Sequence, residues 1–211
     1  MLDLTLDYHS HILPGCDHGS DSVETSRGQL DMAKAAGIRV LCATPHFYPH
    51  MENPDRFLRR RAQSFSRLQA CLEPDDPQIR LGAEVLICDG LERMAELDAL
   101  CLEGTSELLL ELPFYHWPES IWDTIFRLHE LDGIRLVIAH VDRYPVPDIE
   151  RLIGEGIALQ LNAEGLLKPR TRKLYRQWIE AGYVRYLGSD VHMLGTGYRD
   201  WEKCKKLLRK S

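Results

Sequence analysis

The 211-residue chain has no apolar run long enough to cross a membrane and no C-x-x-C cysteine pair. A membrane-spanning helix needs roughly 20 consecutive apolar residues. The start of the chain, MLDLTLDYHSH, also lacks the basic and long apolar stretches of a signal peptide. The six cysteines are scattered, and without an export signal this favours free thiols in a reducing compartment over disulfides. We therefore expect a cytoplasmic protein without membrane insertion.

The chain is also poor in basic residues relative to acidic ones. It has 26 Lys and Arg against 32 Asp and Glu, which gives a formal net charge of −6. A nucleic-acid-binding domain normally presents a basic face, so this balance argues against one. It does not exclude an anionic substrate, because bound divalent metal ions reverse the local sign of a carboxylate-rich pocket.

What the sequence does contain is a regular alternation of β-type and helical segments. There is no internal repeat, low-complexity segment or long linker, so we expect residues 1–211 to form a single domain. The patterns predict strands at 4–9, 39–44, 78–87, 107–112, 135–140, 158–162 and 184–190. They predict helices at 22–38, 55–72, 90–100, 119–133, 148–156, 172–182 and 201–210.

About seven β-α units in one chain predict an α/β protein with a parallel sheet. A closed (β/α) barrel leaves no sheet edge exposed, and it is our main expectation. An open doubly wound sheet is the alternative. In a barrel of this kind the chemistry lies at the carboxyl-terminal ends of the strands. The residues at those ends are therefore the first candidates for a functional site.

Potential metal ligands stand at the end of nearly every predicted strand. They are His9, His11, His46, Glu84, Glu111, His140, Asp190 and His192. Residues i and i+2 of a strand point to the same face, so His9 and His11 form a pair. Glu84 and Glu111 lie in apolar strands, where an ionised carboxylate needs a cation or several hydrogen-bond donors. Only the sixth strand brings no ligand, since it ends at Asn162.

The joint pattern predicts a metal centre rather than separate ion pairs. Asp17 or His18, in the segment GCDHG, is a further candidate ligand. About nine ligands exceed what one ion needs. At roughly three to four protein ligands per ion, they indicate two or three divalent ions with a bridging carboxylate. Nitrogen and oxygen ligands fit zinc, manganese or iron and do not separate these metals.

The segments DYHSHILPGCDHG, ATPHF, GAEV, LELP, AHVDR and SDVH, in this order, resemble the PHP (polymerase and histidinol phosphatase) superfamily. They are most similar to its bacterial protein-tyrosine-phosphatase branch, which is associated with capsule and exopolysaccharide synthesis. The stretch HILPG is the most specific part, and the resemblance runs from Asp7 to about Arg199. It implies a distorted (β/α)7 TIM-like barrel and, as partner, a phosphotyrosine protein such as a bacterial tyrosine kinase. It leaves the oligomeric state open.

The resemblance also implies a trinuclear site. The first ion would be held by His9, His11, Glu84 and Asp190. The second would share Glu84 and add Glu111 and His140. The third would take His46, His192 and one residue of GCDHG. In that segment His18 stands where the family pattern G-x-D-D-G has an aspartate, and Asp17 is the alternative ligand.

Two arginines are predicted to contact the substrate. Arg143 matches a phosphate-binding arginine of the resembling family, and a guanidinium fits two phosphoryl oxygens. The alternative is a surface arginine paired with Asp142 or Asp148. Arg199 is a candidate for the rim of a site that binds a phosphorylated peptide, although a charged segment is more often only a solvated face.

These residues predict a metal-dependent phosphatase in which a metal-activated hydroxide attacks phosphorus directly. Arg143, Glu84 and Asp190 are the predicted catalytic residues. No C-x5-R loop is present, which argues against a thiolate mechanism. A small-molecule phosphomonoesterase, such as a histidinol phosphatase, is one alternative. A non-catalytic metal-binding regulatory module is the other, because GCDHG departs from the family pattern.

Overall fold

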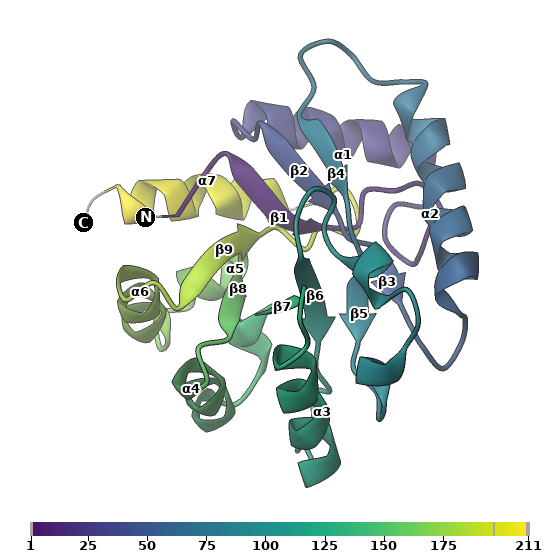
Figure 1. The fold of residues 1–211 in the computed structure, drawn as a ribbon. Coiled ribbons are helices and arrows are strands. Elements are labelled where there is room, and N and C mark those ends of the chain that lie inside the picture. The colour runs from purple at the N-terminus through teal and green to yellow at the C-terminus, as the bar shows by residue number, and fades with distance from the viewer. Residues whose placement is uncertain (1, 196, 210–211) are drawn as a thin grey trace.

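The computed structural model describes residues 2–195 and 197–209 as an α/β fold in which parallel strands are surrounded by helices (Figure 1). The strands are β1 (Leu6–Ser10), β2 (Val40–Ala43), β3 (His46–Phe47), β4 (Gln78–Leu81), β5 (Glu84–Leu86), β6 (Glu107–Glu111), β7 (Arg135–Ile138), β8 (Ala158–Asn162) and β9 (Val184–Gly188). Each pairing between named strands is parallel. The predicted α/β class with parallel strands is therefore confirmed.

The strands form two hydrogen-bonded sheets. One has the order β1-β2-β4 and the other the order β3-β5-β6-β7-β8-β9. A parallel bridge between Ser10 and Val191 joins the end of β1 to the segment after β9. The N–H of Asp190 also donates to the His9 carbonyl at 2.8 Å. In the part of the chain that the structure describes, no single closed sheet forms, in contrast to the simple closed barrel that we expected.

The sheet is divided because the second and third predicted strands are each interrupted. Pro45 separates β2 from β3, since proline has no N–H to donate to a strand ladder. Gly82 and Ala83 separate β4 from β5, and a Cβ on Gly82 would come within 3.3 Å of the Thr44 side chain. β2 pairs with β4 and β3 with β5, so the two breaks lie side by side. The second break also places His46 in register with Glu84.

The outer layer consists mainly of six longer helices (Figure 1). They are α1 (Val23–Ala35), α2 (Pro54–Gln69), α3 (Glu119–His129), α4 (Val146–Gly154), α6 (Arg172–Glu180) and α7 (Gly197–Leu208). Ser22 and Asn53 cap α1 and α2, each accepting a hydrogen bond from the backbone N–H three residues later. No helix among the described residues combines the length and apolar content needed to cross a membrane.

Two local predictions fail for backbone reasons. The helix predicted at 90–100 is wrong, because the structure has two short 3₁₀ turns there, Leu91–Arg93 and Leu97–Leu100. Gly90 (φ 80°) and Glu96 (φ 61°) adopt left-handed backbone conformations that a right-handed helix does not accommodate. The sequence reading also missed the short helix α5 (Ala163–Leu167), which follows β8 directly.

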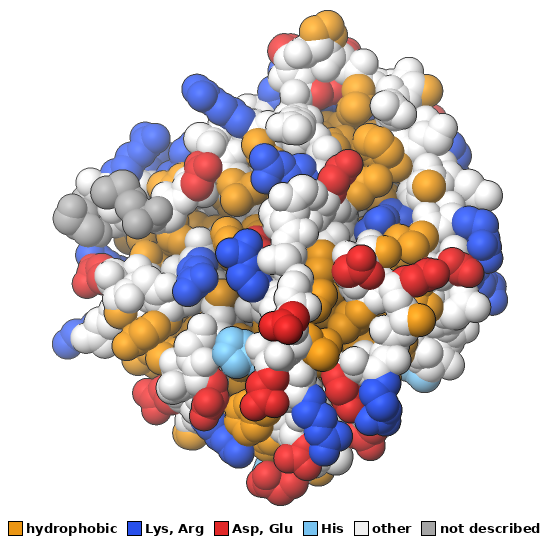
Figure 2. Space-filling view, viewed as in Figure 1, with side chains coloured by type: hydrophobic (Ala, Val, Ile, Leu, Met, Phe, Trp, Pro, Cys, Tyr) orange, Lys and Arg blue, Asp and Glu red, His pale blue; other side chains and the backbone are white. Residues whose placement is uncertain are grey.

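Both faces of the strands are buried. Leu108 and Leu110 of β6 pack into the main core together with the inward faces of the helices. Leu109, between them, belongs to a smaller cluster with Tyr8 and Val137, as the alternation of side chains along a strand requires. On the face seen in Figure 2, basic and acidic side chains are interspersed rather than separated into one charged patch.

Candidate metal centre

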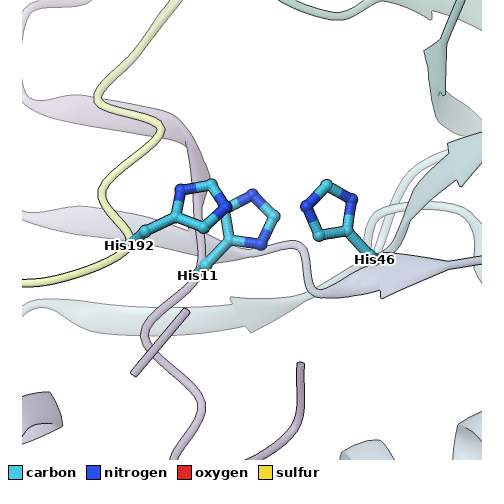
Figure 3. A group of neighbouring side chains, drawn as sticks. All are labelled: His11, His46 and His192. Carbon is cyan, nitrogen blue, oxygen red and sulfur yellow. The ribbon is translucent and has the colours of Figure 1, made fainter. Parts of the chain in front are cut away.

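The strand ends bring together a compact group of histidine and acidic side chains. Its members lie on or just after β1, β3, β5, β6, β7 and β9: His9, His11, His46, Glu84, Glu111, His140, Asp190 and His192. The structure thus assembles all eight residues that the sequence placed at strand ends. Figure 3 shows His11 beside His192, with His46 facing them, and the ring centroids lie 4.0 Å (His11–His192) and 4.5 Å (His11–His46) apart.

Glu84 occupies the middle of this group. Its Oε2 lies 3.2 Å from His9 Nε2, 3.3 Å from His11 Nε2 and 2.9 Å from His46 Nδ1. Its Oε1 lies 2.8 Å from His140 Nε2. Burial alone would raise the pKa of Glu84, but the charge of His9 and the close approach of the other imidazoles hold it well below its usual range. Glu84 is therefore an ionised carboxylate shared by several imidazoles.

The ligand atoms fall into three overlapping triads, in each of which the atoms lie within 4.8 Å of one another. The triads are His9, His11 and Asp190; His46, Glu84 and Glu111; and His11, His46 and His192. Three protein ligands are what a catalytic divalent ion commonly receives, with the remaining position open. Burial, followed by the charge of His11, lowers the pKa of His192 to about 4. His192 is therefore a neutral imidazole at neutral pH, the form that binds metals.

Two supporting side chains fix the tautomers of the first histidine pair. His9 Nδ1 lies 3.1 Å from the amide oxygen of Gln160, and His11 Nδ1 lies 2.7 Å from Asp17 Oδ2. Both partners accept hydrogen bonds, so each Nδ1 carries a proton and each Nε2 is the ring nitrogen that faces Glu84. The two Nε2 atoms lie only 3.0 Å apart and also face Glu84. Two imidazole nitrogens and a carboxylate that converge in this way are arranged as ligands of a shared cation.

Several buried atoms of the group have no hydrogen-bond partner among the described residues. They include Glu84 Oε2, His46 Nδ1 and His140 Nδ1. Buried polar atoms are satisfied in the large majority of cases, and an uncompensated buried carboxylate is costly. The donor set, nitrogen and oxygen without thiolate, is one that zinc, manganese or iron accepts. The residues present therefore fit bound divalent metal ions.

Asp17 and His18 have different surroundings. Asp17 accepts hydrogen bonds from His11 and from the backbone N–H groups of His46 and Gly19, the last two at 2.9 Å. Burial would raise the pKa of Asp17, but the hydrogen bond and charge of His11 hold it far below its usual range. The exposed His18 ring lies 4.5 Å from the His46 ring and 4.8 Å from the His192 ring. Asp17 thus supports a ligand, whereas His18 lies beside the third triad.

The two predicted substrate arginines lie in different places. Arg143, in a 3₁₀ turn (Val141–Arg143) after β7, forms an ion pair with Asp190, and its side chain is 36% exposed. It therefore stands at the edge of the group, and its partner is neither Asp142 nor Asp148. Arg199, in α7, lines a separate hollow of about 220 Å³ together with Met32 of α1. None of the residues lining that hollow belongs to the metal-ligand group.

Strand β8 contributes two residues that were not predicted from the sequence to be part of the site. Gln160 and Asn162 are almost fully buried, at 0% and 1% exposure. Gln160 accepts a hydrogen bond from the His140 N–H at 2.6 Å and donates to Asn162 Oδ1 at 3.0 Å. Asn162 donates in turn to Asp190 Oδ2 at 3.0 Å. Two amides on one face of an otherwise apolar strand were the available signal, and together they link His9, His140 and Asp190.

Comparisons with known proteins find sequence relatives along most of this chain. The family model described as "Capsular polysaccharide synthesis, CpsB/CapC" matches residues 5–211. The tyrosine-protein phosphatase YwqE of Bacillus subtilis (strain 168) is 29% identical over 205 residues, which cover 90% of this chain and 78% of YwqE. The tyrosine-protein phosphatase CpsB of Streptococcus pneumoniae is 28% identical over 208 residues, which cover 90% of this chain and 84% of CpsB.

A solved structure shares the fold of this chain. It comes from work on YwqE of Bacillus subtilis and CpsB of Streptococcus pneumoniae, described as unique metal-dependent tyrosine phosphatases. The match has a TM-score of 0.80 at 25% sequence identity and covers 98% of this chain and 87% of that chain. Because the family model spans nearly the whole sequence, the chain belongs to the CpsB/CapC family of capsular polysaccharide synthesis.

Proposed function

We propose that this protein is a metal-dependent protein-tyrosine phosphatase that regulates polysaccharide synthesis. The observation that carries the proposal is the buried Glu84 carboxylate, which four imidazoles approach within 3.3 Å. Its Oε2 has no hydrogen-bond partner in the part of the chain that the structure describes. The family membership and the names of the relatives supply the reaction class. The proposed substrate is a phosphotyrosine protein, with a bacterial tyrosine kinase as the first candidate.

We assign two or three divalent ions, of manganese, iron or zinc, to the centre. The first set of ligands is His9, His11, Glu84 and Asp190. The second is Glu84, Glu111 and His140, with His46 nearby. The third is His46, His192 and His18, and Asp17 holds His11 from behind. The choice of His18 over Asp17 is supported by the several hydrogen bonds that Asp17 already accepts.

Ions bound there would supply Lewis acidity, which lowers the pKa of water and neutralises charge on phosphoryl oxygens. The chain itself provides orientation. Gln160 and Asn162 hold His9 and Asp190 in place through hydrogen bonds. The negative charge of Glu84 would balance positive charge in both ligand sets that share it. The Arg143 guanidinium, paired with Asp190 and partly exposed, is available to hold a phosphoryl group at the edge of the centre. The leaving phenol has an ordinary pKa of about 10, so it departs without strong acid assistance.

The proposal extends to the architecture and the location. We regard the two sheets as one distorted (β/α)7 barrel within a single domain, residues 1–211. This view is supported by the adjacent breaks at Pro45 and Gly82 and by the Ser10–Val191 bridge. We place the protein in the cytoplasm, which is consistent with its six free cysteines.

Metal analysis and a small substrate panel test the proposal. Elemental mass spectrometry of the Mn²⁺-reconstituted protein should find two or more ions per chain. Turnover should be measured on p-nitrophenyl phosphate, a phosphotyrosine peptide and histidinol phosphate, with the peptide expected to have the highest kcat/KM. A preference for histidinol phosphate would instead identify a small-molecule phosphomonoesterase. Full metal occupancy without turnover on any of the three would identify a regulatory module.

A further inference from the structure

A cavity adjoins the centre on the side of His18 and His46. Its volume is about 260 Å³. Its remaining walls come from the segment after β3 and the first turns of α2, including Tyr48, Arg56 and Arg60. None of the roles assigned above uses this part of the cavity. It is the adjoining space into which the rest of a large substrate can extend.

The charged side chains that line this cavity differ in whether they have an ion-pair partner. Asp17 is engaged by His11, and Glu52 forms an ion pair with Arg60, which also donates to the His46 carbonyl at 3.3 Å. Arg56 lies one helical turn before Arg60 and is exposed. Within residues 2–195 and 197–209, its guanidinium has no ion-pair partner and makes no side-chain hydrogen bond. Among the described residues, Arg56 is therefore the guanidinium of this cavity that no carboxylate pairs with.

The other walls suit an extended peptide. The Tyr48 ring stacks on the His46 ring, with centroids 5.2 Å apart and planes 15° apart. Met51 also lines the cavity, and it is 67% exposed at the rim. A flat aromatic wall and a flexible apolar side chain accommodate many peptide side chains with little selectivity. Among these wall groups, Arg56 is the one suited to select a charge.

We propose that this cavity binds the peptide segment next to the phosphotyrosine and that Arg56 selects an acidic side chain there. The inference rests on the proposed phosphatase function and adds a preference for acidic target sequences. A guanidinium binds a carboxylate through parallel N–H donors. The phosphoryl group of the substrate is a second anionic partner with the same chemistry, so the experiment must separate the two.

The test compares two phosphotyrosine peptides that differ only in flanking residues, Glu in one and Gln in the other, with p-nitrophenyl phosphate alongside. The Mn²⁺-loaded protein should prefer the Glu peptide by about two- to fivefold in kcat/KM, a preference that salt weakens. Arg56→Gln should remove this preference and leave p-nitrophenyl phosphate turnover unchanged. Arg56→Glu should favour a third peptide with Lys at the flanks.

Arg59→Gln is the matched control, because Arg59 is exposed on the same helix and does not line the cavity. It should retain the preference, and the metal content of all variants should equal that of the parent protein. If Arg56→Gln lowers turnover of p-nitrophenyl phosphate as much as that of the Glu peptide, Arg56 binds the phosphoryl group and the inference is wrong. Equal kcat/KM for both peptides in an active parent enzyme overturns the inference alone, whereas a parent inactive on every substrate overturns the proposed function with it.

Discussion

Strand β6 carries two glutamates, Glu107 and Glu111, on the same face but at opposite ends of the fold. Residues four apart in a strand share a face, and these two begin and end the strand. Glu107 accepts hydrogen bonds from the hydroxyls of Tyr8 at 3.0 Å and Tyr186 at 2.5 Å. Glu111 instead faces imidazole nitrogens, among them His140 Nε2 at 3.8 Å. One end of the strand meets donors, and the other meets metal ligands.

At the tyrosine end of β6, the hydrogen-bonding capacity of the carboxylate is met by neighbouring side chains. Both oxygens of Glu107 have a hydroxyl donor, and the Tyr8 and Tyr186 rings stack with centroids 3.9 Å apart. Burial and the nearby Glu107 charge raise the pKa of Tyr8 well above its ordinary value, so its hydroxyl remains a donor. At the other end, Glu84 Oε2 is buried without a hydrogen-bond partner within residues 2–195 and 197–209. In this chain the carboxylate with two hydroxyl donors lies away from the candidate metal centre, and the one with an unsatisfied oxygen lies within it.

Glu84→Gln, at the metal-ligand end, should have the largest effect on metal content and turnover. One carboxylate serves two sets of proposed ligands, so its loss should lower metal content and reduce p-nitrophenyl phosphate turnover at least about a hundredfold. The same measurements on Glu107→Gln should match the parent within about twofold, because the proposed ions do not depend on that end. Retained metal and turnover in Glu84→Gln would remove Glu84 from the centre.

Replacing Gln160 should have the next largest effect. Gln160→Leu removes the acceptor that fixes His9 and the His140 backbone, so we expect Mn²⁺ affinity to fall about 10- to 100-fold. Gln160→Glu keeps an acceptor for His9 Nδ1 and should recover most of that affinity. Titration with Mn²⁺ by calorimetry gives both values. If both variants lose affinity equally, Gln160 acts through packing and not through the His9 tautomer.

Much of the fold was predictable because its signals are local. Apolar runs bounded by Gly and Pro marked the strands, and the break at Pro45 has a visible cause in the sequence. The failure at 90–100 depends on Glu96, whose left-handed backbone has no counterpart in residue type. The division into two sheets was not predicted either, because the pairing of β2 with β4 and of β3 with β5 depends on contacts distant in sequence.

The candidate site was predictable for those side chains whose position depends only on where a strand ends. Parallel strands end at one edge, so side chains such as His9, Glu111 and His140 had to meet there. The supporting residues were not predictable, because a buried glutamine such as Gln160 is equally suited to bonding any nearby backbone group. The roles of Asp17 and His18 also required coordinates, since adjacent residues of an irregular loop point in directions that sequence does not encode.

The smallest expected effect concerns the tyrosine end of β6, and it is the change in stability caused by Glu107→Gln. An amide weakens two charge-assisted hydrogen bonds, so the free energy of unfolding of the metal-free protein should fall by about 1–3 kcal/mol in urea denaturation. Adding Mn²⁺ should still raise the thermal midpoint of this variant as much as that of the parent, because metal binding stabilises through the other end. Tyr183→Phe is the control, since Tyr183 is 44% exposed and should leave stability unchanged. A smaller Mn²⁺-induced shift in Glu107→Gln than in the parent would mean that the tyrosine end and the metal end are coupled.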